Sequence, residues 1–402
     1  MTTYTADWIL PIADDPIERG FVTFADGRIV DVGRDRPAGA VDLGRAVVMP
    51  SLVNAHTHLE LSYLHGRVPP ARSFTEWVRP LMALRRQYPD PHAEEIVSAA
   101  RAAVTAARQA GTGLVGDISN TLITVPLLRG SGMLAQVFYE LLGFNIDDAA
   151  GRVAEARTRV NGLAGGDVRI SLAAHAPYSV APPLFTAIRA DVDASAHPIT
   201  SVHLGESADE VEFVKHTTGP LRQLLEDLGV WTDAWGAELP SGQSPVGYLS
   251  DLGFLDRCVL VVHGVQFDGD DLSRLAALGV TVASCPRSNR YVGAGDPPLE
   301  AFYAMDVDVA FGTDSLASVE DLNIFAELKA ARRLAPRVSA RKLLESATLT
   351  GARALGFGEV LGTLEAGKRA SVIAVALPQG VTDVEEYLVS GIEPADVRWV
   401  EA

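Results

Sequence analysis

The chain is poor in cysteine and lacks a long apolar run, and each absence excludes a class of protein. Its two cysteines, Cys258 and Cys285, lie in apolar, strand-like runs, so neither a disulfide framework nor a cysteine-based zinc site is expected. No apolar segment reaches the roughly 18 residues that a spanning helix needs, and the N-terminus lacks a basic start followed by an apolar stretch. The sequence therefore predicts a soluble, cytoplasmic protein that does not bind a membrane.

Basic residues are also scarce relative to acidic ones. The 34 Lys and Arg residues face 51 Asp and Glu residues, which gives a formal net charge of -17 at pH 7. Nucleic-acid polymers and anionic lipids are bound by clusters of Lys and Arg, so neither is expected as a partner. With 48% hydrophobic residues, the 402-residue chain can bury a large core. We expect a globular protein with a small-molecule partner, and the sequence leaves open whether it is a monomer or a homodimer.

Short β-branched, apolar runs alternate with helical patterns from about residue 46 onward. Eight such runs can be counted: AVVMPSLVNAH, GTGLVGDIS, GMLAQVFYEL, DVRISLAAH, ITSVHLGE, CVLVVHG, GVTVASC and VDVAFGTD. Helical spacing of apolar residues lies between them, for example in residues 93–111 and 270–279, both of which end at a glycine. This alternation is typical of parallel βαβ units. It predicts an α/β fold, a (β/α)8 TIM-like barrel over residues 47–357.

The two ends of the chain have a different pattern. The stretches WILPI, GFVTFADGRIVDVG and ASVIAVALP are strand-like and are not separated by long helices. Asp26-Gly27 is a typical two-residue hairpin turn. The termini are therefore predicted to form a small β-sandwich domain together, from residues 1–46 plus 358–402.

A glycine-rich stretch, GTGLVG at residues 111–116, has the spacing of a dinucleotide-binding motif. That motif must follow a strand and open a helix, whereas this stretch ends a helix and opens a strand. A nucleotide cofactor is therefore not expected.

Histidines and one aspartate stand where predicted strands end. His56 and His58 lie two residues apart in a strand, so their side chains point to the same face. The other members of the set also follow strands: His175, His203, His263 and Asp314. In a barrel these ends converge on one face, where active sites are built. Neutral imidazoles with a carboxylate suit one divalent metal per chain, Zn first, with Fe or Mn compatible; ordinary strand histidines are the alternative.

Five motifs in this order resemble those of the amidohydrolase superfamily, in particular its metal-dependent deaminase branch. They are P-x-x-x-N-x-H-x-H at Pro50 to His58, HAPYS at His175, HLGES at His203, VVHG ending at Gly264, and GTDS at Gly312 to Ser315. The resemblance covers nearly the whole chain, because a small β domain built from both ends is also typical of that branch.

The resemblance implies a role for each residue of the set. It makes His56, His58, His203 and Asp314 the ligands of a single metal, Glu206 the proton shuttle, and His263 a partner of the water that the metal activates. Asp314 would also take up a proton during the reaction, and His175 would face the substrate. Glu206 has an alternative role as a helix-start glutamate, favoured there by the helix dipole. Glu140 is the one candidate to bridge a second metal.

Further resemblances concern the substrate. HTHLELS, HAPYSV and CPRSN, the last at Cys285 to Asn289, are similar to segments of the aminodeoxyfutalosine deaminases of the alternative menaquinone pathway. FTEWV resembles a segment whose glutamate contacts ribose hydroxyls, which would make Glu76 a sugar contact; a solvated glutamate at a helix start is the alternative. Arg287 and Arg290 are candidate partners for a substrate carboxylate, or else surface arginines.

Together these observations predict an enzyme, a hydrolase of C–N bonds other than peptide bonds. Hydroxide generated at a divalent cation would attack an electron-poor ring carbon that carries an amine. The expected reaction is hydrolytic deamination of an adenosine-like nucleoside of the aminodeoxyfutalosine, adenosine or S-adenosylhomocysteine type. A cyclic amidohydrolase or a triazine-type chlorohydrolase is the alternative. A non-catalytic barrel is disfavoured because all the metal ligands and Glu206 are present in the sequence.

Overall fold

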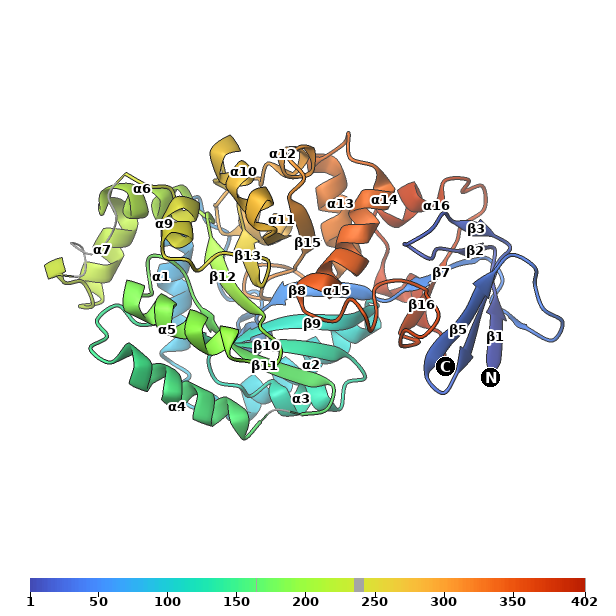
Figure 1. The fold of residues 1–402 in the computed structure, drawn as a ribbon, viewed down its shortest axis with the longest axis horizontal. Helices are drawn as coiled ribbons and strands as arrows, with labels where there is room; N and C mark the ends of the chain where they lie inside the picture. Colours follow the sequence, from blue (N-terminus) through green and yellow to red (C-terminus); the bar gives the residue numbers. More distant parts are fainter. Residues whose placement is uncertain (164, 235–241, 402) are drawn as a thin grey trace.

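The computed structural model describes residues 1–163, 165–234 and 242–401, and two parallel sheets lie at its centre (Figure 1). Their strand orders are β11-β10-β9-β8 and β12-β13-β14-β15. The strands are β8 Leu52–Thr57, β9 Thr112–Ser119, β10 Leu134–Leu141, β11 Val168–Ala174, β12 Thr200–Leu204, β13 Val259–His263, β14 Thr281–Ser284 and β15 Asp308–Phe311. Each of the eight predicted runs therefore contains a parallel strand.

Backbone hydrogen bonds join the two sheets at both of their facing edges. His203 N at the end of β12 donates to the carbonyl of His175, which follows β11, at 2.9 Å. Asp314 N after β15 donates to the carbonyl of His56 in β8 at 3.0 Å. The strand ends that carry the predicted site are therefore neighbours in space.

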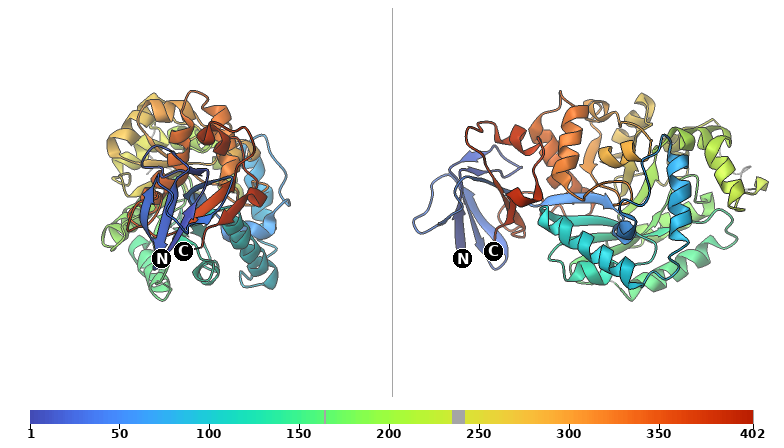
Figure 2. Two further views of the ribbon diagram at one scale, coloured as in Figure 1. Left: turned by 90° about the vertical axis from the view of Figure 1, so that its right-hand side faces the viewer. Right: turned by 180° about the vertical axis from the view of Figure 1, so that it is seen from behind.

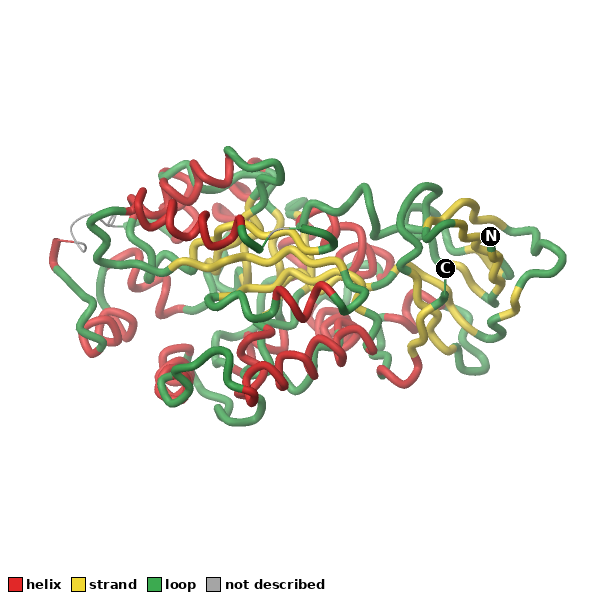
Figure 3. The backbone as a smooth tube through the Cα atoms, turned by 90° about the horizontal axis from the view of Figure 1, so that it is seen from below, coloured by secondary structure: helices red, strands yellow, loops and turns green. Residues whose placement is uncertain are grey.

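Helices lie on the outer faces of the strands, as Figure 3 shows. The helices up to residue 260 are α1 Phe74–Arg85, α2 Glu94–Gln109, α3 Val125–Arg129, α4 Ala149–Asn161, α5 Pro182–Asp193, α6 Ala208–His216, α7 Gly219–Asp227 and α9 Pro245–Asp251. Those that follow are α10 Gly269–Leu278, α11 Pro286–Tyr291, α12 Leu299–Ala304, α13 Ile324–Leu334, α14 Ala340–Glu345, α15 Gly351–Ala354 and α16 Val384–Leu388. Shorter turns are the 3-10 helices η1 Leu59–Leu64 and η3 Pro394–Asp396 and the π-helix η2 Ser346–Thr350. None of the described helices is long and apolar enough to cross a membrane.

The strands are buried on both faces. Along β13, Leu260 and Val262 belong to one buried cluster, whereas Val259 and Val261 belong to a second, larger cluster that includes helix residues. Because successive side chains of a strand point to opposite faces, this division separates the side toward the other strands from the side toward the helices. Such burial explains why the runs read as continuous apolar segments.

Two further sheets lie at one end of the elongated molecule, one from the N-terminal segment alone and one from both termini (Figure 2). One has the order β5-β4-β1-β6, with β1 Thr2–Thr5, β4 Phe21–Ala25, β5 Arg28–Gly33 and β6 Val41–Asp42. The other has the order β17-β16-β7-β2-β3, with β2 Trp8–Ile9, β3 Ile17–Glu18, β7 Ala46–Pro50, β16 Val372–Ala376 and β17 Val397–Trp399. Phe24 of the first and Val48 of the second share one buried cluster. The predicted hairpin turn is present, with positive φ at Asp26 and Gly27.

One predicted strand is split between two sheets. The run at residues 46–56 was expected to be a single strand of the barrel, but β7 pairs antiparallel with β16 of the terminal sheet. The chain changes sheet at Ser51, whose N–H donates to the carbonyl of Ser371, while Leu52 N donates to the carbonyl of Gly111, both at 2.9 Å. Both halves are fully buried, and the run AVVMPSLV continues across the junction, so hydrophobicity alone gave no sign of the change of sheet.

Candidate metal and active site

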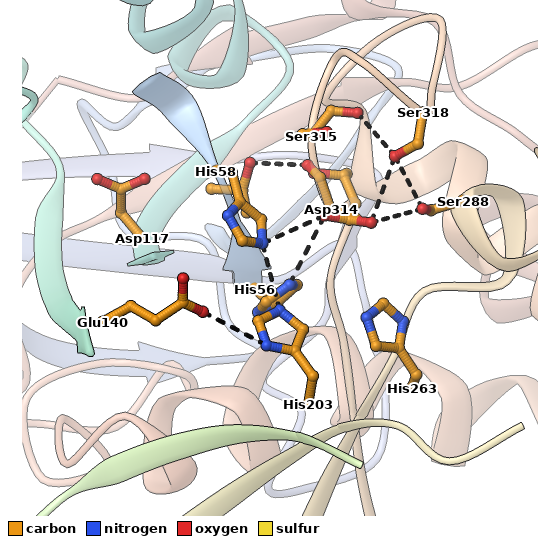
Figure 4. Close-up of polar contacts among 12 residues, drawn as sticks. His56, His58, Asp117, Glu140, His203, His263, Ser288, Asp314, Ser315 and Ser318 are labelled. Atoms are coloured by element: carbon orange, nitrogen blue, oxygen red, sulfur yellow. Dashed lines mark hydrogen bonds and ion pairs between the residues drawn. The ribbon is translucent and has the colours of Figure 1, made fainter. Parts of the chain in front are cut away.

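Three imidazoles and one carboxylate converge at the carboxyl ends of β8, β12 and β15 (Figure 4). His203 Nε2 lies 3.3 Å from His58 Nε2. Asp314 Oδ1 lies 3.5 Å from His58 Nε2 and 3.7 Å from His56 Nε2. The structure therefore brings together all four predicted metal ligands, from segments that are far apart in the sequence.

The histidines of this group have the properties of metal ligands. His56 is fully buried, and neither of its ring nitrogens has a hydrogen-bond partner among the described residues. Buried polar atoms are normally hydrogen-bonded, so these nitrogens indicate a missing partner. Burial also lowers the pKa of His56 and of His58 to about 3, which keeps both rings neutral with a lone pair to donate. The residues present therefore fit a divalent cation.

A backbone carbonyl fixes the tautomer of His203. Its Nδ1 lies 2.9 Å from the carbonyl oxygen of His175, and because that oxygen only accepts, Nδ1 carries the proton. The unprotonated Nε2 then faces His58. This is the common arrangement in which the second nitrogen of a metal-binding imidazole is held by a hydrogen bond.

Two serines hold the carboxylate of Asp314. Ser288 Oγ in α11 donates to Asp314 Oδ2 at 2.6 Å, and Ser318 Oγ donates to the same oxygen at 3.3 Å. Burial alone would raise the pKa of Asp314, but the neighbouring His56, His58 and His263 hold it well below its usual value. The carboxylate is therefore ionised, with Oδ1 directed at the imidazoles.

Backbone conformations at the strand ends are unusual. Asp314 has a φ of 61° and His263 a φ of 77°, in the left-handed region that non-glycine residues rarely occupy. Next to them, a Cβ on Gly312 would lie 2.7 Å from the Cβ of His56, so glycine is required for this close approach. Strained conformations of this kind cluster at functional sites.

Glu206 and His263 form a second pair beside the imidazoles. Glu206 Oε1 lies 3.7 Å from His263 Nε2, and Glu206 is only 4% exposed. Burial, with the nearby carboxylates of Asp314 and Glu210, raises the pKa of Glu206 well above its usual value. Glu206 precedes Ser207, the N-cap of α6, so it is not part of that helix and the helix-start alternative does not describe it.

Two residues that position this pair were missed in the sequence. Glu210 in α6 accepts hydrogen bonds from the backbone N–H groups of Gly205 and Glu206, both at 2.9 Å. Asn289 Oδ1 accepts a hydrogen bond from His263 Nδ1 at 2.9 Å, so Nδ1 carries the proton of the neutral ring and Nε2 is unprotonated. Asn289 closes the CPRSN segment, which therefore held a signal for it. No sequence pattern pointed to Glu210.

A cavity of about 220 Å³ opens above the imidazoles. Its floor includes His58, His203, Glu206, His263 and Asp314. Its walls include His175, Tyr178, Glu140 and Asn120, with apolar side chains from α1, from α7 and from the loop after β10. His175 lines the cavity, and its Nδ1 is hydrogen-bonded to Ser179 Oγ.

The structure does not bring the other predicted substrate contacts to this cavity. The side chain of Glu76 is 56% exposed, and it accepts a hydrogen bond from Arg72 N at 3.3 Å. Arg287 forms ion pairs with Glu327 at 2.6 Å and with Asp321 at 2.9 Å. Arg290, also outside the cavity, is paired with Asp296.

Glu140 lies close enough to raise the question of a second metal. With His175 and His203 it forms another group of potential ligands, and its Oε1 is 3.5 Å from His203 Nδ1. That nitrogen already donates its proton to the His175 carbonyl, however, so it has no free lone pair for a metal. The geometry therefore favours one cation over two.

Neutral imidazoles, a carboxylate and an adjacent buried glutamate are the parts of a metal-dependent hydrolase. Comparison with known proteins agrees with that class. Residues 47–395 match the amidohydrolase family, and the chain belongs to that family. The superfamily predicted from the five motifs is thereby confirmed.

Relatives and solved structures are similar over most of their length. A 5-methylthioadenosine/S-adenosylhomocysteine deaminase of Moorella thermoacetica is 30% identical over 98% of this chain and 90% of its own. An aminodeoxyfutalosine deaminase of Deinococcus radiodurans is 31% identical over 84% of this chain and 80% of its own. The crystal structure of an adenosine deaminase from Xanthomonas campestris with bound zinc has a TM-score of 0.83 and 26% identity, covering 98% of this chain and 90% of that one.

Proposed function

We propose that this protein is a metal-dependent hydrolase that deaminates an adenosine-like nucleoside. The observation that carries the proposal is the convergence of His56, His58, His203 and Asp314 beside the buried pair of Glu206 and His263. The deaminase names of the relatives in Moorella and Deinococcus support it, as does the nucleoside deaminase of similar structure.

The cation we assign is a single Zn ion, with Fe or Mn compatible with the same ligands. His56, His58, His203 and Asp314 would hold it. When bound, such a cation lowers the pKa of water and so supplies hydroxide near neutral pH.

Glu206 would transfer a proton, and His263 would orient the nucleophile. Because the pKa of Glu206 is raised above its usual value, its Oε1 would hold one proton taken from the water and pass it to a ring nitrogen, where that proton stays in the product. His263, fixed by Asn289, presents an unprotonated Nε2 toward Glu206 and so keeps the attacking water in line. Asp314 would take up the second proton of the water and deliver it to the departing amine, which then leaves as ammonia.

The fold we propose around this site is a closed (β/α)8 barrel with a small β-sandwich from both termini. The hydrogen bonds from His203 N and Asp314 N across the two sheet edges support closure of the barrel. The buried cluster shared by the two terminal sheets supports the sandwich. In this proposal the barrel begins after Pro50 rather than at residue 47, which the pairing of β7 with β16 supports.

The test combines metal content with product formation. Purified protein is analysed for Zn, Fe and Mn, and its action on a panel of adenosine derivatives is followed by ultraviolet absorbance and ammonia release. Variants Glu206→Gln and Glu212→Gln are compared, because Glu212 is an exposed glutamate of α6. We expect about one metal per chain, and deamination that is lost in the Glu206 variant alone. Release of halide from a triazine or opening of a ring amide, without ammonia from any nucleoside, would refute the deaminase proposal.

A further inference from the structure

One wall of the cavity carries a hydrogen-bonded series of three polar side chains. Arg85 Nη2, at the end of α1, donates to Asn120 Oδ1 at 3.2 Å. Asn120 Nδ2 then donates to Glu140 Oε2 at 2.9 Å. All three residues line the cavity, and they come from α1, from the loop after β9 and from β10.

Each end of this series has polar atoms that make no hydrogen bond within the described residues. At the inner end, Glu140 Oε1 is buried and has no hydrogen-bond partner among the described residues. At the outer end, the guanidinium of Arg85 carries five N–H donors, and the bond to Asn120 is its one hydrogen bond within the described residues. The two ends can therefore accept a hydrogen bond from a ligand and donate hydrogen bonds to it, respectively.

The positive charge of Arg85 is incompletely matched by the protein. Its nearest carboxylate is that of Glu60, whose Oε1 lies 4.0 Å from Arg85 Nη2. Glu60 is itself occupied, because its two oxygens accept hydrogen bonds from Ser119 Oγ, from Asn120 N and from both N and Oγ1 of Thr121. The side chain of Arg85 is 38% exposed, so a ligand can reach it.

The cavity surface near Arg85 is largely apolar. Trp77 and Leu81 belong to the same helix as Arg85, at intervals of four residues, and Leu224, Leu225 and Leu228 at α7 also line the cavity. Among the described residues that line this cavity, Arg85 is the only lysine or arginine. A single cation at the edge of an apolar pocket is a typical way to select one group of a ligand by its charge.

We propose that Arg85 selects a substrate whose nucleoside carries an apolar arm ending in a carboxylate. The carboxylate would pair with the Arg85 guanidinium, the arm would lie against Trp77 and Leu224, and Glu140 Oε1 would accept a hydroxyl of the sugar. This inference rests on the proposed deaminase function and specifies its substrate class. It replaces Arg287, which Glu327 and Asp321 already occupy, as the residue that recognises an anion.

The test uses two synthetic substrates that differ only in charge. Both are 5′-arylthio derivatives of 5′-deoxyadenosine, one with a carboxylate on the ring and the other with a carboxamide of the same shape. The wild type, Arg85→Gln, Arg85→Lys and Arg86→Gln are compared, because Arg86 is exposed, adjacent and outside the cavity. We expect the wild type to favour the carboxylate in kcat/KM by roughly tenfold to a hundredfold, as charge-assisted hydrogen bonds of this kind give. The preference should reside in KM.

In Arg85→Gln the ratio should approach one, Arg85→Lys should retain part of it, and Arg86→Gln should keep the wild-type ratio. A wild type that treats the two compounds alike, or an Arg85→Gln ratio equal to that of the wild type, overturns the inference while leaving the deaminase proposal intact. Absence of all deamination overturns the deaminase proposal instead. Calorimetric binding of the two compounds to the same variants then still decides the role of Arg85, because it does not require turnover.

Discussion

Asn289 Oδ1 accepts a hydrogen bond from His263 Nδ1 at 2.9 Å, and both side chains are almost completely buried. The bond determines which nitrogen of His263 faces Glu206. Burial lowers the pKa of His263 to about 3, so the ring is neutral and only one of its nitrogens carries a proton. The chemistry at the floor of the cavity thus depends on a residue that does not line it.

We predict that Asn289→Ala lowers kcat by about 10- to 100-fold and leaves the metal content unchanged, because loss of a supporting hydrogen bond has effects of that size. Steady-state kinetics and metal analysis measure the two quantities. Asn289→Asp keeps an acceptor at the same position and should retain more activity than the alanine variant. Equal activity in the wild type and Asn289→Ala would show that the His263 tautomer is set by something else.

Ser288 should tune the affinity for the metal. Its hydroxyl donates to Asp314 Oδ2 at 2.6 Å, whereas Ser318 donates to the same oxygen at 3.3 Å. We expect Ser288→Ala to weaken metal binding by about tenfold, and Ser318→Ala to weaken it less. Competition with a chelator of known affinity measures both. A larger effect from Ser318 than from Ser288 would contradict the geometry of the carboxylate.

The ion pair of Arg287 and Glu327 should matter for stability rather than for recognition of the substrate. Glu327 is fully buried, and its Oε1 lies 2.6 Å from Arg287 Nε. Removing one member of a buried pair leaves the other charge poorly compensated, so Glu327→Ala should reduce the free energy of unfolding by about 3 kcal/mol. Asp321 is the more exposed partner of Arg287, so Asp321→Ala should reduce the free energy of unfolding by about 1 kcal/mol or less.

Denaturant unfolding measures these changes, and the two charge-matched substrates measure recognition. Arg287→Ala should leave the ratio of carboxylate to carboxamide turnover as it is in the wild type. A collapse of that ratio in Arg287→Ala would restore the role in carboxylate binding that the position of Arg287 after the seventh parallel strand suggested.

The location of the metal site could be predicted from the sequence because strands have a short, fixed period. His56 and His58 share a face by virtue of their spacing, and His203, His263 and Asp314 follow runs too apolar to be surface segments. Parallel strands bring such ends together whatever the intervening helices contain. The location of the site therefore depended on local pattern and on one general rule of topology, whereas the choice of ligands within it came from the resemblance to the amidohydrolase superfamily.

The substrate contacts depend on partners that are distant in the sequence. Arg287 looked available because it stands near a strand end, but Glu327, 40 residues further along, occupies it. Arg85 lies at the end of α1, outside the FTEWV segment, and it gains its position by reaching Asn120 across the cavity wall. Which arginine is occupied and which is free follows from tertiary packing, so spacing along the chain could not distinguish them.

Asp117 should make the stability of the protein depend on pH. It is fully buried at β9, where its Oδ1 accepts from Leu59 N at 2.9 Å and its Oδ2 accepts from Thr124 Oγ1 at 2.6 Å. Burial raises its pKa from 3.8 to about 7, against the opposing effect of these hydrogen bonds. The folded state therefore binds a proton more tightly than the unfolded state does. Its contribution is most favourable below about pH 4 and declines as the pH rises toward 7.

The variant Asp117→Asn keeps an acceptor for Leu59 N and cannot ionise. We expect the wild type to lose stability relative to this variant by up to about 1.4 kcal/mol per pH unit between pH 4 and 7, with no further change above that range. Denaturant unfolding at a series of pH values measures the free energy of unfolding of both proteins. Subtracting one from the other cancels the contribution of buried carboxyls that both share, such as Glu210. As a control, Asp308→Asn changes an exposed residue of β15, and its free energy of unfolding should change with pH as that of the wild type does. A difference between wild type and Asp117→Asn that is constant with pH would mean that Asp117 is ionised in the folded protein throughout, held by Leu59 N and Thr124 more strongly than burial opposes.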